Sequence, residues 1–280
     1  MSRSKRTLIA KETVQIVEQG CYLMDGKSVC IAEAVSRSKK RTVHYRPVDF
    51  DVLRKQRQQM LSERARCSTS IRVANQTTLA GARDLLSESE SPVLCLNFAS
   101  AKNPGGGFLS GSQAQEESLA RASALYHCIH DQRGYYDVNR ACGTCLYTDH
   151  MIYSPDVPVF RDDDDQLISD PYVISIVTSP AVNLGALLNN HPDEADQVPE
   201  IMAARIEKVL SLAVSRGYDS LVLGAWGCGV FRNDPKSVAS WFANALNGDF
   251  AGAFQRITFA VLDHTKDLAC FTAFDEQLSP

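Results

Sequence analysis

The chain has 280 residues, of which 44% are hydrophobic and 22% are charged, and its net charge at pH 7 is −4. This composition is ordinary for a globular domain, the acidic balance argues against a protein that coats nucleic acid, and no apolar run reaches the roughly 18 residues of a membrane helix. No signal peptide is expected, and nine scattered cysteines fit free thiols in the cytoplasm better than a disulfide framework.

The first 67 residues are predicted to form an accessory region, and residues 68–280 the main domain. Residues 5–24 place apolar side chains among charges as a helix does. The stretch 28–47 is predicted to be a β-hairpin whose turn is the polar segment SRSKK. A polar helix is expected over about 48–66. The N-terminal region is therefore a helix-and-hairpin extension.

Strands and helices alternate in the rest of the chain. The stretch SIRVANQTTLAGARDLLSE is predicted to be a strand, a loop and a helix whose N-cap is Thr77 or Thr78. The continuous apolar run in SPVLCLNFAS is typical of a buried strand. Further strands are predicted at 172–178, 220–225 and 257–262, and helices at 118–130, 195–216 and 235–247. This alternation predicts a three-layer α/β/α fold with its functional loops at the carboxyl ends of the strands.

Three consecutive glycines, Gly105 to Gly107, directly follow the strand predicted near residues 91–98. Pro104 and the glycines cannot continue that strand. Because glycine has no side chain, a ligand could approach the backbone of this turn closely. A flexible surface loop is the alternative interpretation of the glycines alone.

Two adjacent glutamates, Glu116 and Glu117, stand just beyond the glycines. The segment from Ser112 to Gln115 fits a capping box, so a helix is expected to begin near Gln113 with both glutamates in or near its first turn. Acidic residues at that position also stabilise the helix dipole without any further function. A helix N-terminus lowers the pKa of a glutamate and burial raises it, so the sequence leaves their protonation open.

A second glycine cluster lies in LVLGAWGCGVFRNDP, where a predicted strand runs into a glycine-rich turn. Asp234 and Pro235 then fit the N-cap and first position of a helix. Such a turn can hold a diphosphate on its backbone N–H groups, and a tight structural turn is the alternative. Neither a Walker loop nor the G-x-G-x-x-G pattern of dinucleotide-binding folds is present.

Together these segments resemble the poly(ADP-ribose) glycohydrolase family. GGG followed after seven residues by QEE resembles its signature, and the stretches NFASAKNPGGGFLSGSQAQEESLARASALY, LYTDHMIYSPDVPVFRDD and LGAWGCGVFRNDP are similar to its bacterial, microbial-type branch. The resemblance implies a macrodomain fold with a mixed sheet and hydrolysis of the ribose–ribose O-glycosidic bond. Poly(ADP-ribose) or ADP-ribosylated proteins would be the partners and ADP-ribose the product, with no cofactor or metal and with a place in reversing ADP-ribosylation, as in the DNA damage response.

The same resemblance implies a role for each matched residue. Glu117 would be the catalytic acid, which protonates the leaving ribose oxygen and later activates water, and Glu116 would bind the distal ribose hydroxyls. Near the ribose, the implied substrate-binding residues are Asn103, Gly105, Gly106, Gly107 and Gln115, and at the diphosphate they are Gly227, Cys228, Gly229, Val230 and Phe231. Since glycosidases usually place two carboxylates on opposite sides of the bond, neighbouring glutamates favour a mechanism with one working carboxylate.

Two other functions stay open at this point. A non-catalytic ADP-ribose reader would use the same glycine turns, and a hydrolase of single ADP-ribosyl units on proteins would cleave at the same ribose carbon. Phe271 and Phe274 are candidates for the adenine wall because an aromatic ring suits a flat base, although core packing explains either of them equally well.

Three further motifs are assigned no chemistry. Cys142 and Cys145 form a CxxC pair without the second pair of ligands that a zinc site needs, so no metal is predicted. The acidic run RDDDDQ is predicted to be a solvated loop. Tyr135 and Tyr136 are expected to pack within a loop, with contact of one of them with the ligand as the alternative.

Overall fold

The computed structural model describes residues 1–63 and 66–279, which divide into two compact units. The first unit comprises Met1–His44, Asn97–Ala141 and His150–Ser179, and the second comprises Tyr45–Leu96, Cys142–Asp149 and Pro180–Pro280. The predicted boundary at residue 67 between an accessory and a catalytic region stays a prediction.

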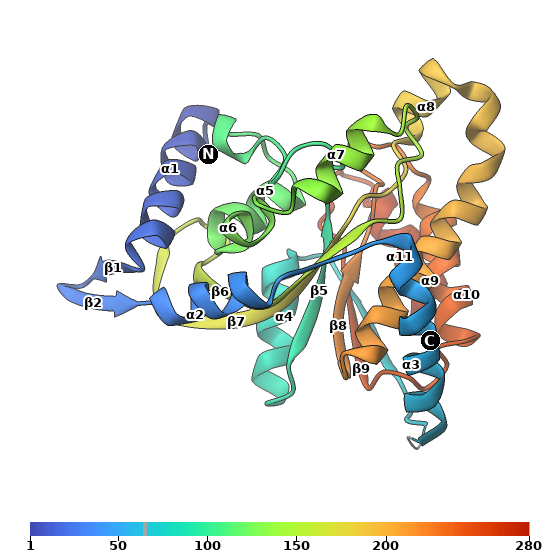
Figure 1. Ribbon diagram of the computed structural model, residues 1–280, viewed down its shortest axis with the longest axis horizontal. Coiled ribbons are helices and arrows are strands. Elements are labelled where there is room, and N and C mark those ends of the chain that lie inside the picture. Colours follow the sequence, from blue (N-terminus) through green and yellow to red (C-terminus); the bar gives the residue numbers. More distant parts are fainter. Residues whose placement is uncertain (64–65, 280) are drawn as a thin grey trace. The chain divides into compact units, whose positions relative to one another are not determined.

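The first unit combines an antiparallel strand pair with several short helices (Figure 1). Its strands β6 and β7 pair over most of their length; β6 is buried at all but one residue, and β7 is buried from Ile174 onward. The helices and strands of this unit are α1 (Arg3–Gln19), β1 (Cys21–Met24), β2 (Lys27–Cys30), α2 (Ala32–Arg41), the 3₁₀ turn η2 (Phe108–Ser110), α5 (Gln115–Ala122), α6 (Leu125–Ile129), α7 (Arg133–Ala141), β6 (Met151–Arg161) and β7 (Leu167–Ser179). Two strands, β3 (Val43–Tyr45) and β5 (Val93–Phe98), include the positions at which the chain passes from one unit to the other.

The second unit is built on parallel strands in the order β5-β8-β9-β4. Figure 1 shows β8 and β9 between α4 on one side and α9 and α10 on the other. Strands covered on both faces need continuous apolar sequences, and β8 is buried at every residue. The further elements of this unit are η1 (Pro47–Asp49), α3 (Phe50–Glu63), β4 (Ser70–Ala74), α4 (Thr78–Glu88), α8 (Leu184–Asn190), η3 (Pro192–Gln197), α9 (Val198–Ser215), β8 (Ser220–Gly224), α10 (Pro235–Asn247), β9 (Arg256–Ala260) and α11 (Ala269–Leu278).

Most predicted elements of the α/β region are confirmed. The strands predicted near 70, 93, 172, 220 and 257 are present, as are the helices at 195–216 and 235–247. Thr77 caps α4 by accepting from the N–H of Ala80, and Asp234 caps α10 with Pro235 at its first position. The structure contains both parallel and antiparallel strand pairs. This confirms the predicted α/β class with a mixed sheet.

The N-terminal hairpin is predicted in the wrong place. The helix α1 ends at Gln19 because Gly20 takes a left-handed conformation, with φ of 74°. The hairpin is then β1–β2, which turns at Asp25 and Gly26, both with positive φ. The segment SRSKK, predicted to be a turn, lies in α2, where Val35 and Ser38 face inward at helical spacing and the basic side chains face outward.

The helix predicted over 118–130 is two helices. Ser123, in an extended conformation, ends α5, and its hydroxyl donates to the carbonyl of Leu119 and accepts from the N–H of Leu125.

The polar helix predicted over 48–66 is α3, which ends at Glu63; positions 64–65 lie outside the described residues. Strand β6 and helices α7, α8 and α11 were not predicted.

Candidate active site

The glycine turn after β5 is tightly wound rather than open. Gly105 and Gly106 both adopt left-handed conformations, with φ of 66° and 59°, which residues with a Cβ adopt only at a cost. The N–H of Gly106 donates to the carbonyl of Asn103, and the N–H of Phe108 donates to the carbonyl of Gly105. Asn103 itself is exposed at the entrance to the turn. The flexible loop considered from the sequence is therefore an ordered turn.

Helix α5 begins at Gln115, two residues later than predicted, and no capping box forms. Its N-cap is Ala114, which has no side-chain hydrogen bond. The side chain of Gln115 accepts from the N–H of Phe98 at 2.9 Å instead of turning back to the N-cap. Gln115 thus attaches the start of the helix to the end of β5.

Glu116 is a buried carboxyl held at both oxygens. Its Oε2 accepts from the N–H of Ser100 at 2.7 Å, and its Oε1 accepts from Nδ2 of Asn97 at 3.2 Å. Burial raises the pKa of Glu116 to about 8, and the charge of Glu117 adds to the rise while the hydrogen bonds oppose it. Glu116 is therefore a firmly placed group that holds its proton to unusually high pH.

Glu117 is less constrained than its neighbour. Its Oε1 accepts from the N–H of Gly107 at 2.9 Å, the one hydrogen bond that the described residues make to this carboxylate. Its side chain remains partly accessible, because the residue is 9% exposed whereas Glu116 is 3% exposed. Of the two carboxylates, Glu117 has an oxygen left to meet a ligand.

Gly106 packs directly on both carboxylates. A Cβ built at Gly106 would lie 2.5 Å from Oε1 of Glu117 and 3.2 Å from Oε2 of Glu116. No larger residue fits without moving the glutamates. The sequence predicts glycine here so that a ligand can approach the backbone. In the structure, glycine at position 106 is needed because the two carboxylates leave no room for a side chain.

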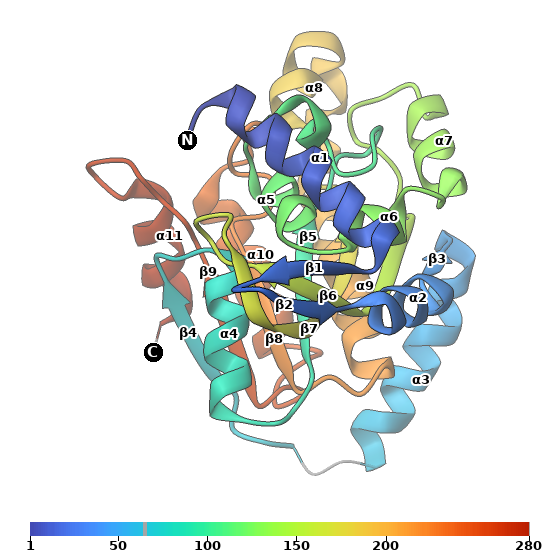
Figure 2. The same ribbon diagram turned by 90° about the vertical axis from the view of Figure 1, so that its left-hand side faces the viewer.

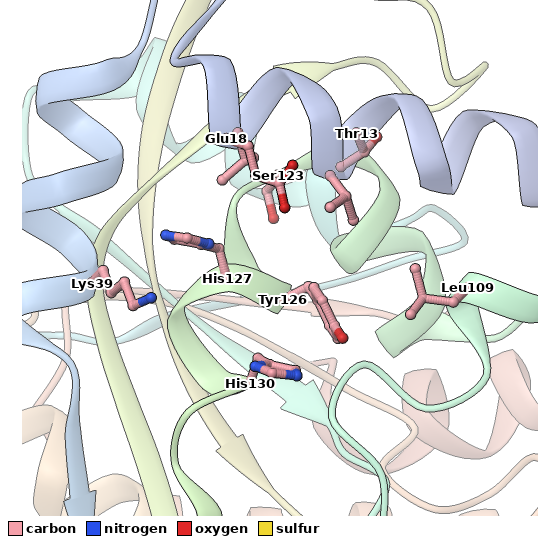
Figure 3. A pocket seen from close by; sticks show the side chains of 10 residues that line it. Thr13, Glu18, Lys39, Leu109, Ser123, Tyr126, His127 and His130 are labelled. Atoms are coloured by element: carbon pink, nitrogen blue, oxygen red, sulfur yellow. The ribbon is translucent and has the colours of Figure 1, made fainter.

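Tyr126 supports the glycine turn from its other side. Its ring lies 4.8 Å from that of Phe108, and a Cβ at Gly105 would come within 3.2 Å of the Tyr126 ring. The same side chain lines a cavity of about 320 Å³ together with Leu109, His127 and His130 (Figure 3). Figure 2 shows α1 in front of α5, and Ala10 of α1 packs with Phe108 in the core.

The second glycine turn lies in the second unit, between β8 and α10. Gly227 has φ of 79°, and a Cβ there would lie 2.5 Å from Nδ2 of Asn233, which donates to the carbonyls of Gly227 and Val182. The N–H of Cys228 is occupied by the carbonyl of Ala225. Asn233, which the sequence analysis missed, therefore fixes the base of this turn.

The tip of that turn is open and presents backbone donors. Val230 is 81% exposed, and a Cβ built at Gly229 would meet no atom within 4 Å. Among the described residues, no hydrogen bond engages the N–H groups of Gly229, Val230 and Phe231. Three successive N–H groups that meet no acceptor within the described residues can serve an anion.

The remaining candidates are placed as follows. Phe271 is half-buried near the start of α11, where its N–H donates to Asp263, whereas Phe274 is fully buried against Phe259. Tyr135 and Tyr136 are buried on α7, so they pack in a helix and not in a loop. All the other predicted site residues lie in one of the two glycine turns or at the start of α5.

The part of the chain that the structure describes has neither a metal-binding cluster nor a membrane-spanning helix. No group of three or more histidine, cysteine, aspartate or glutamate side chains that could hold a metal ion occurs within residues 1–63 and 66–279. In the same residues, no helix is long and apolar enough to cross a bilayer.

Comparison with known proteins places these features in a family. Residues 10–162, more than half of the chain, match the family model described as microbial-type PARG, catalytic domain, where PARG stands for poly(ADP-ribose) glycohydrolase. The chain belongs to this family. The comparison with curated proteins found no match.

Solved structures of bacterial poly(ADP-ribose) glycohydrolases are similar over nearly the whole chain. The enzyme from Thermomonospora curvata bound to the inhibitor ADP-HPD is 43% identical, with a TM-score of 0.90 over 98% of this chain and 99% of that one. The enzyme from Deinococcus radiodurans in complex with ADP-ribose is 44% identical, with a TM-score of 0.82 over 87% of this chain and 96% of that one. These matches confirm the fold and the family that the two glycine motifs predict.

Sequence reasoning missed the residues that hold the glutamates. Asn97 and Ser100 fix Glu116, and Asn97 was the one polar residue in the apolar run of β5. An amide in such a strand requires a buried partner, so the signal was present.

Proposed function

We propose that this protein is a poly(ADP-ribose) glycohydrolase that hydrolyses ribose–ribose O-glycosidic bonds and releases ADP-ribose. The observation that carries the proposal is the unequal pair of carboxylates on the glycine turn. Glu116 is engaged at both oxygens, and Glu117 is engaged at one. A carboxyl with an unengaged oxygen can give a proton to a departing oxygen and take one back from water.

In this mechanism Glu117 is the single working acid and base. Its carboxyl donates a proton to the leaving ribose oxygen as the glycosidic bond breaks and an oxocarbenium-like centre develops. The resulting carboxylate then takes a proton from the water that attacks the same carbon, which restores the acid. Glu116 is held by Asn97 and Ser100 through one bond at each oxygen, and it is proposed to accept the hydroxyls of the distal ribose on the second lone pair that each oxygen retains.

The roles of the other residues follow from their donors. The free N–H groups of Gly229, Val230 and Phe231 are proposed to bind the diphosphate. Gly227 is proposed to contribute the bend of the diphosphate turn. The N–H of Cys228 already donates within the protein, so Cys228 is proposed to shape the backbone of the turn and not to donate to the diphosphate. Phe271 is proposed to contact adenine.

The remaining roles concern the glycine turn of the first unit. Asn103, Gly105, Gly106 and Gly107 are proposed to line the ribose, and Gln115 to hold the start of α5 beside it.

All nine cysteines are free, which supports a reducing compartment such as the cytoplasm.

The test compares ADP-ribose release from poly(ADP-ribose) by the wild type, Glu117→Gln and Glu200→Gln. Glu200 is the matched control, since it is an exposed glutamate in the first turn of α9. Loss of a general acid is expected to lower release by about 100-fold or more in Glu117→Gln. ADP-ribose affinity, measured by calorimetry, should remain close to that of the wild type in both variants.

Two outcomes would contradict the proposal. A wild type that binds ADP-ribose without releasing it from the polymer would be a reader, or a hydrolase of single ADP-ribosyl units, which ADP-ribosylated protein substrates would then distinguish. Equal loss of activity in Glu117→Gln and Glu200→Gln would remove Glu117 from the acid role.

A further inference from the structure

A buried arginine lies one helical turn beyond the glutamates on α5. The side chain of Arg121 is 2% exposed and its Nε donates to Oδ1 of Asp165 at 3.1 Å. Asp165 belongs to the acidic run RDDDDQ, predicted from the sequence to be solvated. Asp163 and Asp164 are indeed exposed, whereas Asp165 is buried.

The other donors of Arg121 go to the segment that leads into α5. Nη1 donates to the carbonyl of Ser112 at 3.2 Å, and Nη2 donates to Oε1 of Gln113 at 2.5 Å and to Oγ of Ser118 at 3.4 Å. Long side chains on a helix point back toward its N-terminus, so Arg121 reaches this segment from within the same helix. Its guanidinium therefore joins the irregular chain before the helix to the first turns of the helix.

This contact holds the chain in front of a helix that has no side-chain cap, although a guanidinium has only donors and does not itself cap the N–H groups of the first turn. Ala114 offers no side-chain acceptor, and the segment from Gly111 to Ala114 contains no regular structure. A cation near a helix N-terminus opposes the helix dipole, so Arg121 needs a compensating charge there, which Asp165 provides.

The pair is also anchored to its surroundings in the first unit. Thr13 of α1 donates its hydroxyl to the carbonyl of Arg121 at 2.6 Å and accepts from Nε of Arg161 at 3.2 Å. Arg161 in turn donates to the carbonyl of Asp165 at 3.0 Å. Arg121 is thus held from α1 and Asp165 from the end of β6, and the bond between Arg161 and Thr13 links the two holds; Figure 3 shows Thr13 on α1.

We propose that Arg121, neutralised by Asp165, is a positioning residue for Glu116 and Glu117. It fixes the chain before α5 and so sets where the first turn of the helix begins. That turn carries the bond from Gly107 to Glu117 and the bonds from Ser100 and Asn97 to Glu116. The inference rests on the proposed function for the role of the glutamates, but the placement of the turn can be measured without activity.

The test uses Arg121→Lys and Asp165→Asn, with Arg205→Lys as the matched control. Arg205 is 1% exposed and donates to Asp149 at 2.9 Å and to the carbonyls of Pro180 and Leu146, all in the second unit. The control is therefore another buried arginine paired with one aspartate and bound to backbone. Each variant is measured at a temperature at which circular dichroism shows it folded.

Three quantities are compared with those of the wild type: kcat and KM for ADP-ribose release, the Kd of ADP-ribose, and amide hydrogen exchange of residues 105–118. Misplacing the acid should lower kcat by about 10- to 100-fold in Arg121→Lys and Asp165→Asn, with KM and Kd changed far less. Exchange over 105–118 should quicken in both variants. In Arg205→Lys both kcat and this exchange should stay near those of the wild type.

Unchanged exchange over 105–118 in Arg121→Lys, or the same loss of kcat in Arg205→Lys, would overturn the inference. If the wild type released no ADP-ribose, the proposed function would fail while hydrogen exchange would still decide whether Arg121 positions the turn. Should Arg121→Lys fail to fold, Asp165→Asn gives the same decision.

Discussion

The raised pKa of Glu116 makes the stability of the protein depend on pH in a defined window. The ordinary value is 4.5, and burial is the main reason that the pKa in the folded protein is about 8. Between these values the folded chain holds a proton that the unfolded chain has lost. The contribution of Glu116 to stability is therefore fully present below about pH 4.5 and is lost as pH rises through 8.

The variant Glu116→Gln removes this dependence, because glutamine has a similar shape and stays neutral. One pKa unit corresponds to about 1.4 kcal/mol, so the wild type should lose about 3 kcal/mol of unfolding free energy relative to Glu116→Gln between about pH 5 and pH 7.5. Urea denaturation of both proteins at the two pH values measures this difference. Other titrating groups are common to both proteins and cancel in the comparison.

Parallel stability curves for the wild type and Glu116→Gln would refute the reasoning. They would mean that Glu116 keeps one protonation state throughout this range and that the bonds from Ser100 and Asn97 outweigh its burial. Glu200→Gln, at an exposed glutamate, is the control for the substitution itself.

Two further substitutions test local features. Gly106→Ala should lower stability by about 1–2 kcal/mol through its left-handed backbone and also abolish most ADP-ribose release, because the new Cβ displaces Glu117. Gly26→Ala is the matched control, with φ of 74° and no atom within 4 Å of a Cβ, so it should show the backbone cost in thermal unfolding and keep its activity. Asp234→Ala removes the N-cap of α10 and should cost about 1 kcal/mol in urea denaturation; an unchanged midpoint would show that its bond to Ser237 contributes nothing.

The parts of the fold predictable from sequence are those with local signals. Continuous apolar runs identified β5 and β8, and Thr77 and Asp234 marked the beginnings of α4 and α10. Strand β6 has no such signal, because Pro155 and Pro158 lie within it. Its pairing with β7 shifts register between Ser154 and Val157, and a shift of this kind is where a strand tolerates proline.

At the N-terminus, turn chemistry indicates the hairpin better than composition does. The polarity of the basic segment SRSKK fits a turn and the surface of a helix equally, and the segment lies in α2. The pair Asp25 and Gly26, flanked by short apolar segments, is the stronger hairpin signal, and it is where the chain turns.

The start of α5 could not be predicted because partners far away in the sequence decide it. Ser112 and Gln115 have the spacing of a capping box, but Gln115 binds the N–H of Phe98 and the carbonyl of Ser112 accepts from Arg121. A local motif predicts only the local alternative, and here the bonds to β5 and to Arg121 in the last turn of the helix prevail.

The adjacency of the two glutamates has a physical explanation in this geometry. Neighbouring residues on a helix point about 100° apart, so each carboxylate meets a different surface. Glu116 turns to the end of β5, where two donors and burial hold it, whereas Glu117 turns to the N–H of Gly107. One helix start therefore produces a fixed, readily protonated carboxyl and a second carboxyl with an unengaged oxygen. Other glycosidases place two carboxylates on opposite sides of the scissile bond. Here one carboxyl can act as both acid and base, provided that the turn carrying it is held in place.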